Sequence, residues 1–151
     1  MNAQQLLEYV IRPALVALEL HSKSAEILVL GTAIQESNLN YVKQLGGGPA
    51  QGLWQMEIAT HDDIWLNFLN YKEKLSAKIL SPGQQPDAER LVYDNRYACQ
   101  MCRIHYLRAP ATLPDANDIR ALGAYWKKFY NTEKGAGTID QFVVNWYKAR
   151  S

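Results

Sequence analysis

The chain has 151 residues, of which 48% are hydrophobic, and this fits one globular domain with a buried core rather than two domains of ordinary size. Its 16 Lys and Arg residues nearly balance its 15 Asp and Glu residues, which disfavours a polyanionic partner such as nucleic acid. No apolar run approaches the roughly 20 residues that cross a bilayer, and the N-terminus lacks the pattern of a signal peptide. We expect a single domain over residues 1–151, made in the cytoplasm without an export signal and not inserted into membranes.

Helical spacing of apolar residues dominates the first part of the chain. Asn2 can cap a first helix, which Pro13 either kinks or divides in two. Ser22 or Ser24 can cap a second segment over residues 25–36, which is apolar on every side. Such a helix is buried, so we predict a central helix that ends at Glu36, followed by an open polar and glycine-rich loop.

The rest of the chain is also predicted to be helical. Thr60 and Asp63 resemble a capping box for a helix that reaches about residue 80, with a break near Tyr71. Further helices are predicted over residues 90–107, from Asn117 or Asp118 to Phe129, and from Thr138 to about Lys148. No run of alternating strand residues is evident, so the predicted fold class is mainly α.

The two cysteines, Cys99 and Cys102, are three residues apart within a predicted helix and therefore share one face. They supply too few ligands for a zinc site unless His105 or a more distant histidine joins them. We interpret both as buried core thiols, and the sequence predicts neither a metal nor another cofactor.

Two short motifs carry a resemblance to a known family. Residues 33–37 are Ala-Ile-Gln-Glu-Ser at the end of the predicted central helix, and residues 52–56 are Gly-Leu-Trp-Gln-Met after the glycine-rich loop. In this order they resemble the soluble lytic transglycosylases and goose-type lysozymes, in which a Glu-Ser pair ends a buried helix and Gly-Leu-Met-Gln follows. Trp54 stands where that pattern has Met. The resemblance implies a lysozyme-like helical fold.

A third part of the family pattern, Ala-Tyr-Asn before a glycine turn, has two candidates here. One is Ala124-Tyr125 and the other is Tyr130-Asn131, and we prefer Tyr130 because its Asn and the glycines after it both match. By resemblance, Tyr130, Asn131 and Gln55 bind substrate. Aromatic residues at helical spacing are more often core, so Trp54 and Trp126 are interpreted as packing residues.

The resemblance implies cleavage of the MurNAc-GlcNAc β-1,4 linkage of peptidoglycan, with Glu36 as the general acid. Physical chemistry supports this role, because a carboxyl at the C-terminal end of an apolar helix feels the negative end of the helix dipole and is partly desolvated. Both effects favour the protonated form that a glycosidase acid needs. Ser37 can either orient Glu36 by a hydrogen bond and contact substrate, or serve only as a polar residue at the helix end.

The role of a second carboxylate, Glu57, has two interpretations. Goose-type lysozymes carry an Asp at the corresponding place that helps to position water, whereas the transglycosylases have no acid there. If Glu57 faces Glu36 across roughly 6.5–9.5 Å, a water fits between them and inverting hydrolysis is possible. Otherwise the N-acetyl group of the substrate must assist, and the resemblance implies a 1,6-anhydro product. The loop over residues 41–51 is expected to border the glycan cleft.

Small size and a missing signal suit a phage or prophage enzyme, either an endolysin released through a holin to the periplasmic cell wall or a protein carried in a virion beside other virion proteins. The alternative is a structural protein of a virion or secretion apparatus that keeps a lysozyme-like scaffold and binds glycan without cleaving it.

Overall fold

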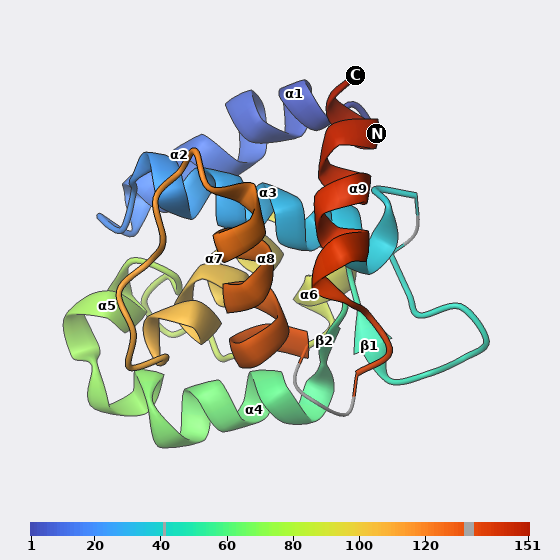
Figure 1. The fold of residues 1–151 in the computed structure, drawn as a ribbon. Coiled ribbons are helices and arrows are strands. Elements are labelled where there is room, and N and C mark those ends of the chain that lie inside the picture. The colour runs from blue at the N-terminus through green and yellow to red at the C-terminus, as the bar shows by residue number, and fades with distance from the viewer. Residues whose placement is uncertain (41, 132–134) are drawn as a thin grey trace.

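The structure is a computed structural model that describes residues 1–40, 42–131 and 135–151, and it is mainly helical (Figure 1). The helices are α1 (Ala3–Leu6), α2 (Arg12–Ala17), α3 (Lys23–Ser37), α4 (Ile58–Asn67), α5 (Glu73–Ala77), α6 (Arg90–Tyr93), α7 (Asn95–Leu107), α8 (Ile119–Trp126) and α9 (Ile139–Arg150). Single π-helical segments follow α1 and α8, over Leu7–Ile11 and Lys127–Asn131, and a 3-10 turn over Leu69–Tyr71 separates α4 from α5. Two short strands, β1 (Ala50–Gln51) and β2 (Met56–Glu57), pair antiparallel with Ala50 opposite Glu57.

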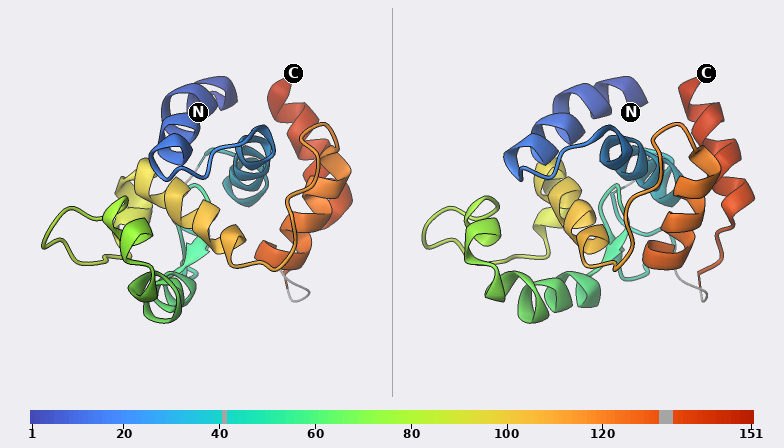
Figure 2. Two further views of the ribbon diagram at one scale, coloured as in Figure 1. Left: turned by 90° about the vertical axis from the view of Figure 1, so that its left-hand side faces the viewer. Right: turned by 60° about the vertical axis from the view of Figure 1, so that its left-hand side comes forward.

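The predicted central helix is α3. Its apolar residues are buried on all sides because α1, α7, α8 and α9 pack around it, as the two views of Figure 2 show. Ser22 caps its N-terminus by accepting a hydrogen bond from the backbone N–H of Ala25. The helix extends one residue beyond the predicted end at Glu36, to Ser37, because Asn38 adopts the left-handed conformation (φ 51°) that terminates it.

The predicted N-terminal caps at Asn2, Asp118 and Thr138 are confirmed, and Thr138 forms a full capping box with Gln141. The predicted single helix over residues 90–107 is wrong. It is divided at Asp94, whose side chain accepts from the backbone N–H of Tyr97 and so begins a new helix there.

One continuous core contains buried apolar residues from Ala3 near the N-terminus to Trp146 in α9. Cys99 and Cys102 are both fully buried in this core, as predicted. No helix among the described residues combines the length and apolar character needed to span a bilayer.

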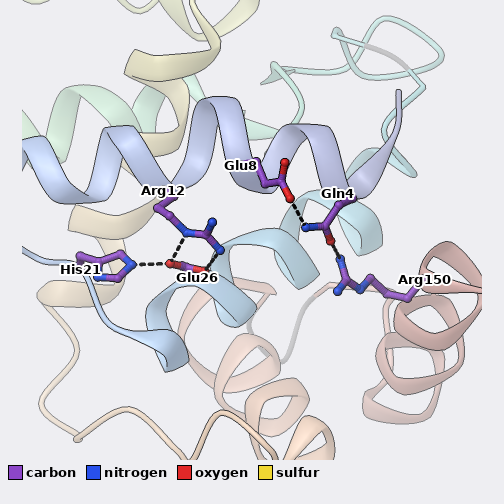
Figure 3. A network of polar contacts seen from close by, with 6 residues as sticks. All are labelled: Gln4, Glu8, Arg12, His21, Glu26 and Arg150. Carbon is purple, nitrogen blue, oxygen red and sulfur yellow. Dashed lines mark hydrogen bonds and ion pairs between the residues drawn. The ribbon is translucent and has the colours of Figure 1, made fainter.

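An ion pair on a buried carboxylate fixes α3 against the N-terminal helices (Figure 3). Glu26, in the first turn of α3, is 2% exposed and accepts two hydrogen bonds of 3.0 Å from the guanidinium of Arg12, while His21 contacts the same carboxylate. In the same view, Gln4 donates to Glu8 and accepts from Arg150 of α9. The hydrogen bond between Gln4 and Arg150 thereby joins the two ends of the chain.

Candidate functional site

A cavity of about 410 Å³ lies beside the C-terminal end of α3. Its lining comes from α3, the loop before β1, the hairpin and the segment after α8, and consists of Glu36, Gln44, Pro49, Ala50, Gln55, Glu57, Tyr130, Asn131 and Gly135. The structure therefore brings every site residue predicted from sequence, except Ser37, to one cavity.

The Glu36 carboxyl of this cavity has a strongly altered acidity. Burial raises the pKa of its carboxyl from 4.5 to about 7, and this outweighs a hydrogen bond from Trp126 that acts in the opposite direction. The indole Nε1–H of Trp126 donates to Oε2 of Glu36 over 2.9 Å. At neutral pH a large fraction of this carboxyl is therefore protonated, as the helix-end argument predicts.

The contact from Trp126 was not predicted. Trp126 is fully buried and packs on Phe142, with ring centroids 5.5 Å apart, so the expected packing role is present. Its indole N–H additionally orients the Glu36 carboxyl, and the sequence carries no signal for this because the two residues are 90 positions apart. Trp54 is a packing residue as expected, and its indole donates to the carbonyl of Val29 in α3 over 2.9 Å.

The Gly-Leu-Trp-Gln motif forms the tight turn that joins β1 to β2. Gly52 has φ of 80°, and a β-carbon on it would lie 2.0 Å from the carbonyl oxygen of Leu91, so only glycine fits. Gln55 also has a positive φ, of 47°, and its backbone and side-chain N–H groups both donate to the carbonyl of Gly52. The turn thus presents Gln55 to the cavity in a fixed conformation.

Tyr130, and not Tyr125, reaches the cavity. Its hydroxyl donates to the carbonyl of Trp54 over 2.5 Å, and its ring stacks on Tyr106 at 5.3 Å. The neighbouring Asn131 accepts a hydrogen bond from Lys127 over 2.7 Å. Tyr125 instead donates to the carbonyl of Ala111, and it lines a different cavity.

Ser37 does not take the orienting and substrate-binding role predicted for it. Its hydroxyl donates to the carbonyl of Ala33 over 3.1 Å and accepts from the backbone N–H of Leu39 over 3.2 Å. The residue is 1% exposed, so substrate cannot reach it without a rearrangement. Its position in the structure is that of the alternative, a polar residue at the end of the helix.

Glu57 is exposed at the start of α4 and lines the same cavity as Glu36. The loop expected to border a cleft contributes Gln44, Pro49 and Ala50 to the lining, and Gln44 accepts from the backbone N–H of Ala50. Gln44 was not predicted, because a glutamine in a loop has no distinguishing sequence context. Residue 41, the first of the expected loop, lies outside the described residues.

Within the described part of the chain, no three His, Cys, Asp or Glu side chains are grouped so that they could hold a metal ion. The chemistry that the arrangement offers is proton donation by Glu36, with a second carboxylate and three amide side chains around the same cavity. In comparisons with known proteins, no family model, no curated sequence and no solved structure matches this chain.

Proposed function

We propose that the protein has a lysozyme-like fold and is a peptidoglycan-cleaving glycosidase, a muramidase or lytic transglycosylase that cuts the MurNAc-GlcNAc β-1,4 linkage. The observation that carries this proposal is the Glu36 carboxyl, which ends a buried helix, lines a polar cavity and has a pKa of about 7. An acid with this pKa keeps its proton near neutral pH and can donate it to the departing glycosidic oxygen.

Four residues around Glu36 have assigned parts in the proposed reaction. The Trp126 indole holds Oε2 of Glu36 as an acceptor, which favours the proton on Oε1. Gln55 and Asn131 carry amides that match the hydroxyl and N-acetyl groups of a glycan. Glu57, on the same cavity, is the candidate for activating water, and the substrate's own N-acetyl group is the alternative nucleophile.

The central test is Glu36→Gln, assayed by the clearing of purified peptidoglycan. Gln is nearly isosteric but cannot donate a catalytic proton, so we expect cleavage to fall to the detection limit while the helical circular dichroism is unchanged. Glu89→Gln makes the same change at an exposed position away from the cavity and serves as the matched control. Wild-type activity in folded Glu36→Gln protein would contradict the proposal.

Glu57→Gln separates the two mechanisms. A base role predicts a loss of turnover of orders of magnitude and a hydrated reducing end in the wild-type product. Assistance by the N-acetyl group predicts a small effect and a 1,6-anhydro end, lighter by one water. Mass spectrometry of the released muropeptides distinguishes the products, and hydrated products from a Glu57→Gln protein of unchanged activity would contradict this scheme.

The biological setting is part of the same proposal. An endolysin released through a holin and a virion-borne enzyme both bring such an activity to bacterial peptidoglycan, and the second would contact other virion proteins. Glycan binding without cleavage by the wild-type protein would instead favour the alternative, a structural protein of a virion or secretion apparatus with this scaffold.

A further inference from the structure

Arg103 of α7 is a buried cation without an acidic partner. The residue is 9% exposed, and its Nε–H donates to the carbonyl of Leu20 over 3.2 Å. Among residues 1–40, 42–131 and 135–151, no carboxylate forms an ion pair with it. Because an arginine carries five N–H donors, this single carbonyl leaves most of the guanidinium's donor capacity unused.

Four other arginines of the chain form ion pairs although they are more exposed. The ion pairs join Arg12 to Glu26, Arg90 to Asp94, Arg108 to Asp63 and Arg120 to Asp140. A mostly buried charge that lacks a counter-ion is costly, because it has lost part of its hydration and gained no compensating attraction. Burial accordingly lowers the pKa of the Arg103 guanidinium, although an arginine stays charged near neutral pH.

Arg103 lines a cavity of about 340 Å³ that shares no lining residue with the cavity of Glu36. The walls come from the end of α7, from residues 109–113 of the segment that crosses the front of Figure 1, and from Tyr125 of α8. Tyr125 fixes this segment by donating to the carbonyl of Ala111 over 2.8 Å. Apart from Arg103, most of the lining residues are apolar or aromatic, with Leu107, Pro110 and Leu113 among them.

We propose that this second cavity binds a carboxylate carried on an apolar body, with Arg103 as its counter-ion. The planar guanidinium fork matches the two oxygens of a carboxylate. Among the described residues, Arg103 is the single cationic residue of the lining, so the cavity matches a monoanion better than a phosphate dianion, whose second charge would have no cation beside it. Small apolar acids and the C-terminus of an apolar peptide share this chemistry.

Binding is tested on the wild-type protein by NMR, following the Arg103 Nε–Hε and backbone resonances during titration with N-acetylphenylalanine. We expect saturation below about 10 mM, with shifts in Arg103 and residues 109–113. The uncharged N-acetylphenylalanine amide should bind at least about tenfold more weakly if the carboxylate is recognised, and phenyl phosphate should also bind more weakly. N-acetyl-dileucine, titrated beside benzoate, distinguishes a peptide terminus from a small free acid as the preferred source.

Arg103→Met retains much of the side-chain volume without the charge and should abolish the difference between acid and amide. Arg96→Met, an exposed position on the same helix, is the matched control and should bind as the wild type does. If Arg103→Met does not fold, Arg103→Lys keeps the charge but loses the fork and should weaken acid binding by about tenfold. Equal binding of acid and amide by the wild type, or no saturable binding of the acid, would overturn the proposal.

Discussion

Burial and a hydrogen bond act in opposite directions on the acidity of Glu36, the residue on which the proposed reaction depends. Burial raises the pKa of Glu36, and the indole N–H of Trp126 lowers it by stabilising the carboxylate. Trp126→Phe removes the donor while keeping an aromatic ring in the core, so we predict that the pKa of Glu36 rises above about 7. The alkaline limb of the pH–activity profile should then move to higher pH.

Trp54→Phe is the control for this prediction, because it also removes a buried indole donor, but one that bonds to the carbonyl of Val29. Its effect should be on stability and not on the position of the alkaline limb. Titration of a ¹³C label in the Glu36 carboxyl measures the same pKa without an activity assay, and an unshifted value in Trp126→Phe would contradict the assigned role.

Single residues were predictable where their neighbours in sequence define their environment. Glu36 ends an apolar helix, so its partial burial and raised pKa follow from residues 25–36 alone. The role of Ser37 depends on the orientation of its hydroxyl, which donates to a backbone carbonyl of its own helix. The proposed roles of Trp126 and Arg103 depend on contacts with residues far away in the sequence, which local sequence patterns do not specify.

At the scale of elements, predicted side-chain caps located the starts of α1, α3, α8 and α9, but one predicted cap was misplaced. The predicted box of Thr60 and Asp63 is wrong, because α4 begins earlier, at Ile58, directly after β2. Asp63 instead accepts from Asn67 and forms an ion pair with Arg108. The hairpin that fixes this start was itself not predicted, since strands of two residues leave no alternating pattern.

The turn between the strands gives a prediction at this scale. Gly52 and Gly83 both have φ of 80°, but a β-carbon at Gly52 would meet the carbonyl oxygen of Leu91 at 2.0 Å, whereas at Gly83 it would meet nothing within 4 Å. Gly83→Ala should therefore cost only the backbone strain, about 1–2 kcal/mol. Gly52→Ala should cost at least about 2 kcal/mol more, and it should displace Gln55.

Urea unfolding of the two glycine variants measures this difference directly, because they share the backbone strain and differ in the steric clash. Peptidoglycan cleavage should fall in Gly52→Ala even at urea concentrations below its unfolding transition, where the variant is folded. Cleavage should be unchanged in Gly83→Ala. An equal loss of stability in Gly52→Ala and Gly83→Ala would show that the turn can rearrange at no cost in free energy. The close approach of Gly52 to Leu91 would then not hold the turn in place.

At the scale of the whole molecule, two buried groups give its stability opposite dependences on pH. The folded-state pKa of Glu36 is raised from 4.5 to about 7, so its stabilising contribution is fully present below pH 4.5 and is lost as the pH rises to about 7. The folded-state pKa of His105 is lowered by burial from 6.5 to about 4, so its contribution is present above pH 6.5 and is lost as the pH falls to about 4. Between pH 4.5 and 6.5, the contribution of Glu36 to the free energy of unfolding falls as the pH rises, whereas that of His105 increases.

Wild-type stability should therefore change little between pH 4.5 and 6.5 on account of these groups, whereas in Glu36→Gln the slope from His105 is no longer opposed. We predict that the free energy of unfolding of Glu36→Gln rises with pH across this range, by up to about 1.4 kcal/mol per pH unit.

At pH 8 the Glu36→Gln variant should be more stable than the wild type by up to about 3 kcal/mol, because it no longer buries a carboxylate there and its amide oxygen can still accept from Trp126. Urea unfolding at a series of pH values measures both effects, and Glu89→Gln should follow the wild-type curve. An acid kept at the cost of stability is typical of a functional site, so a Glu36→Gln protein no more stable than the wild type at pH 8 would remove the physical basis for assigning Glu36 as the proton donor.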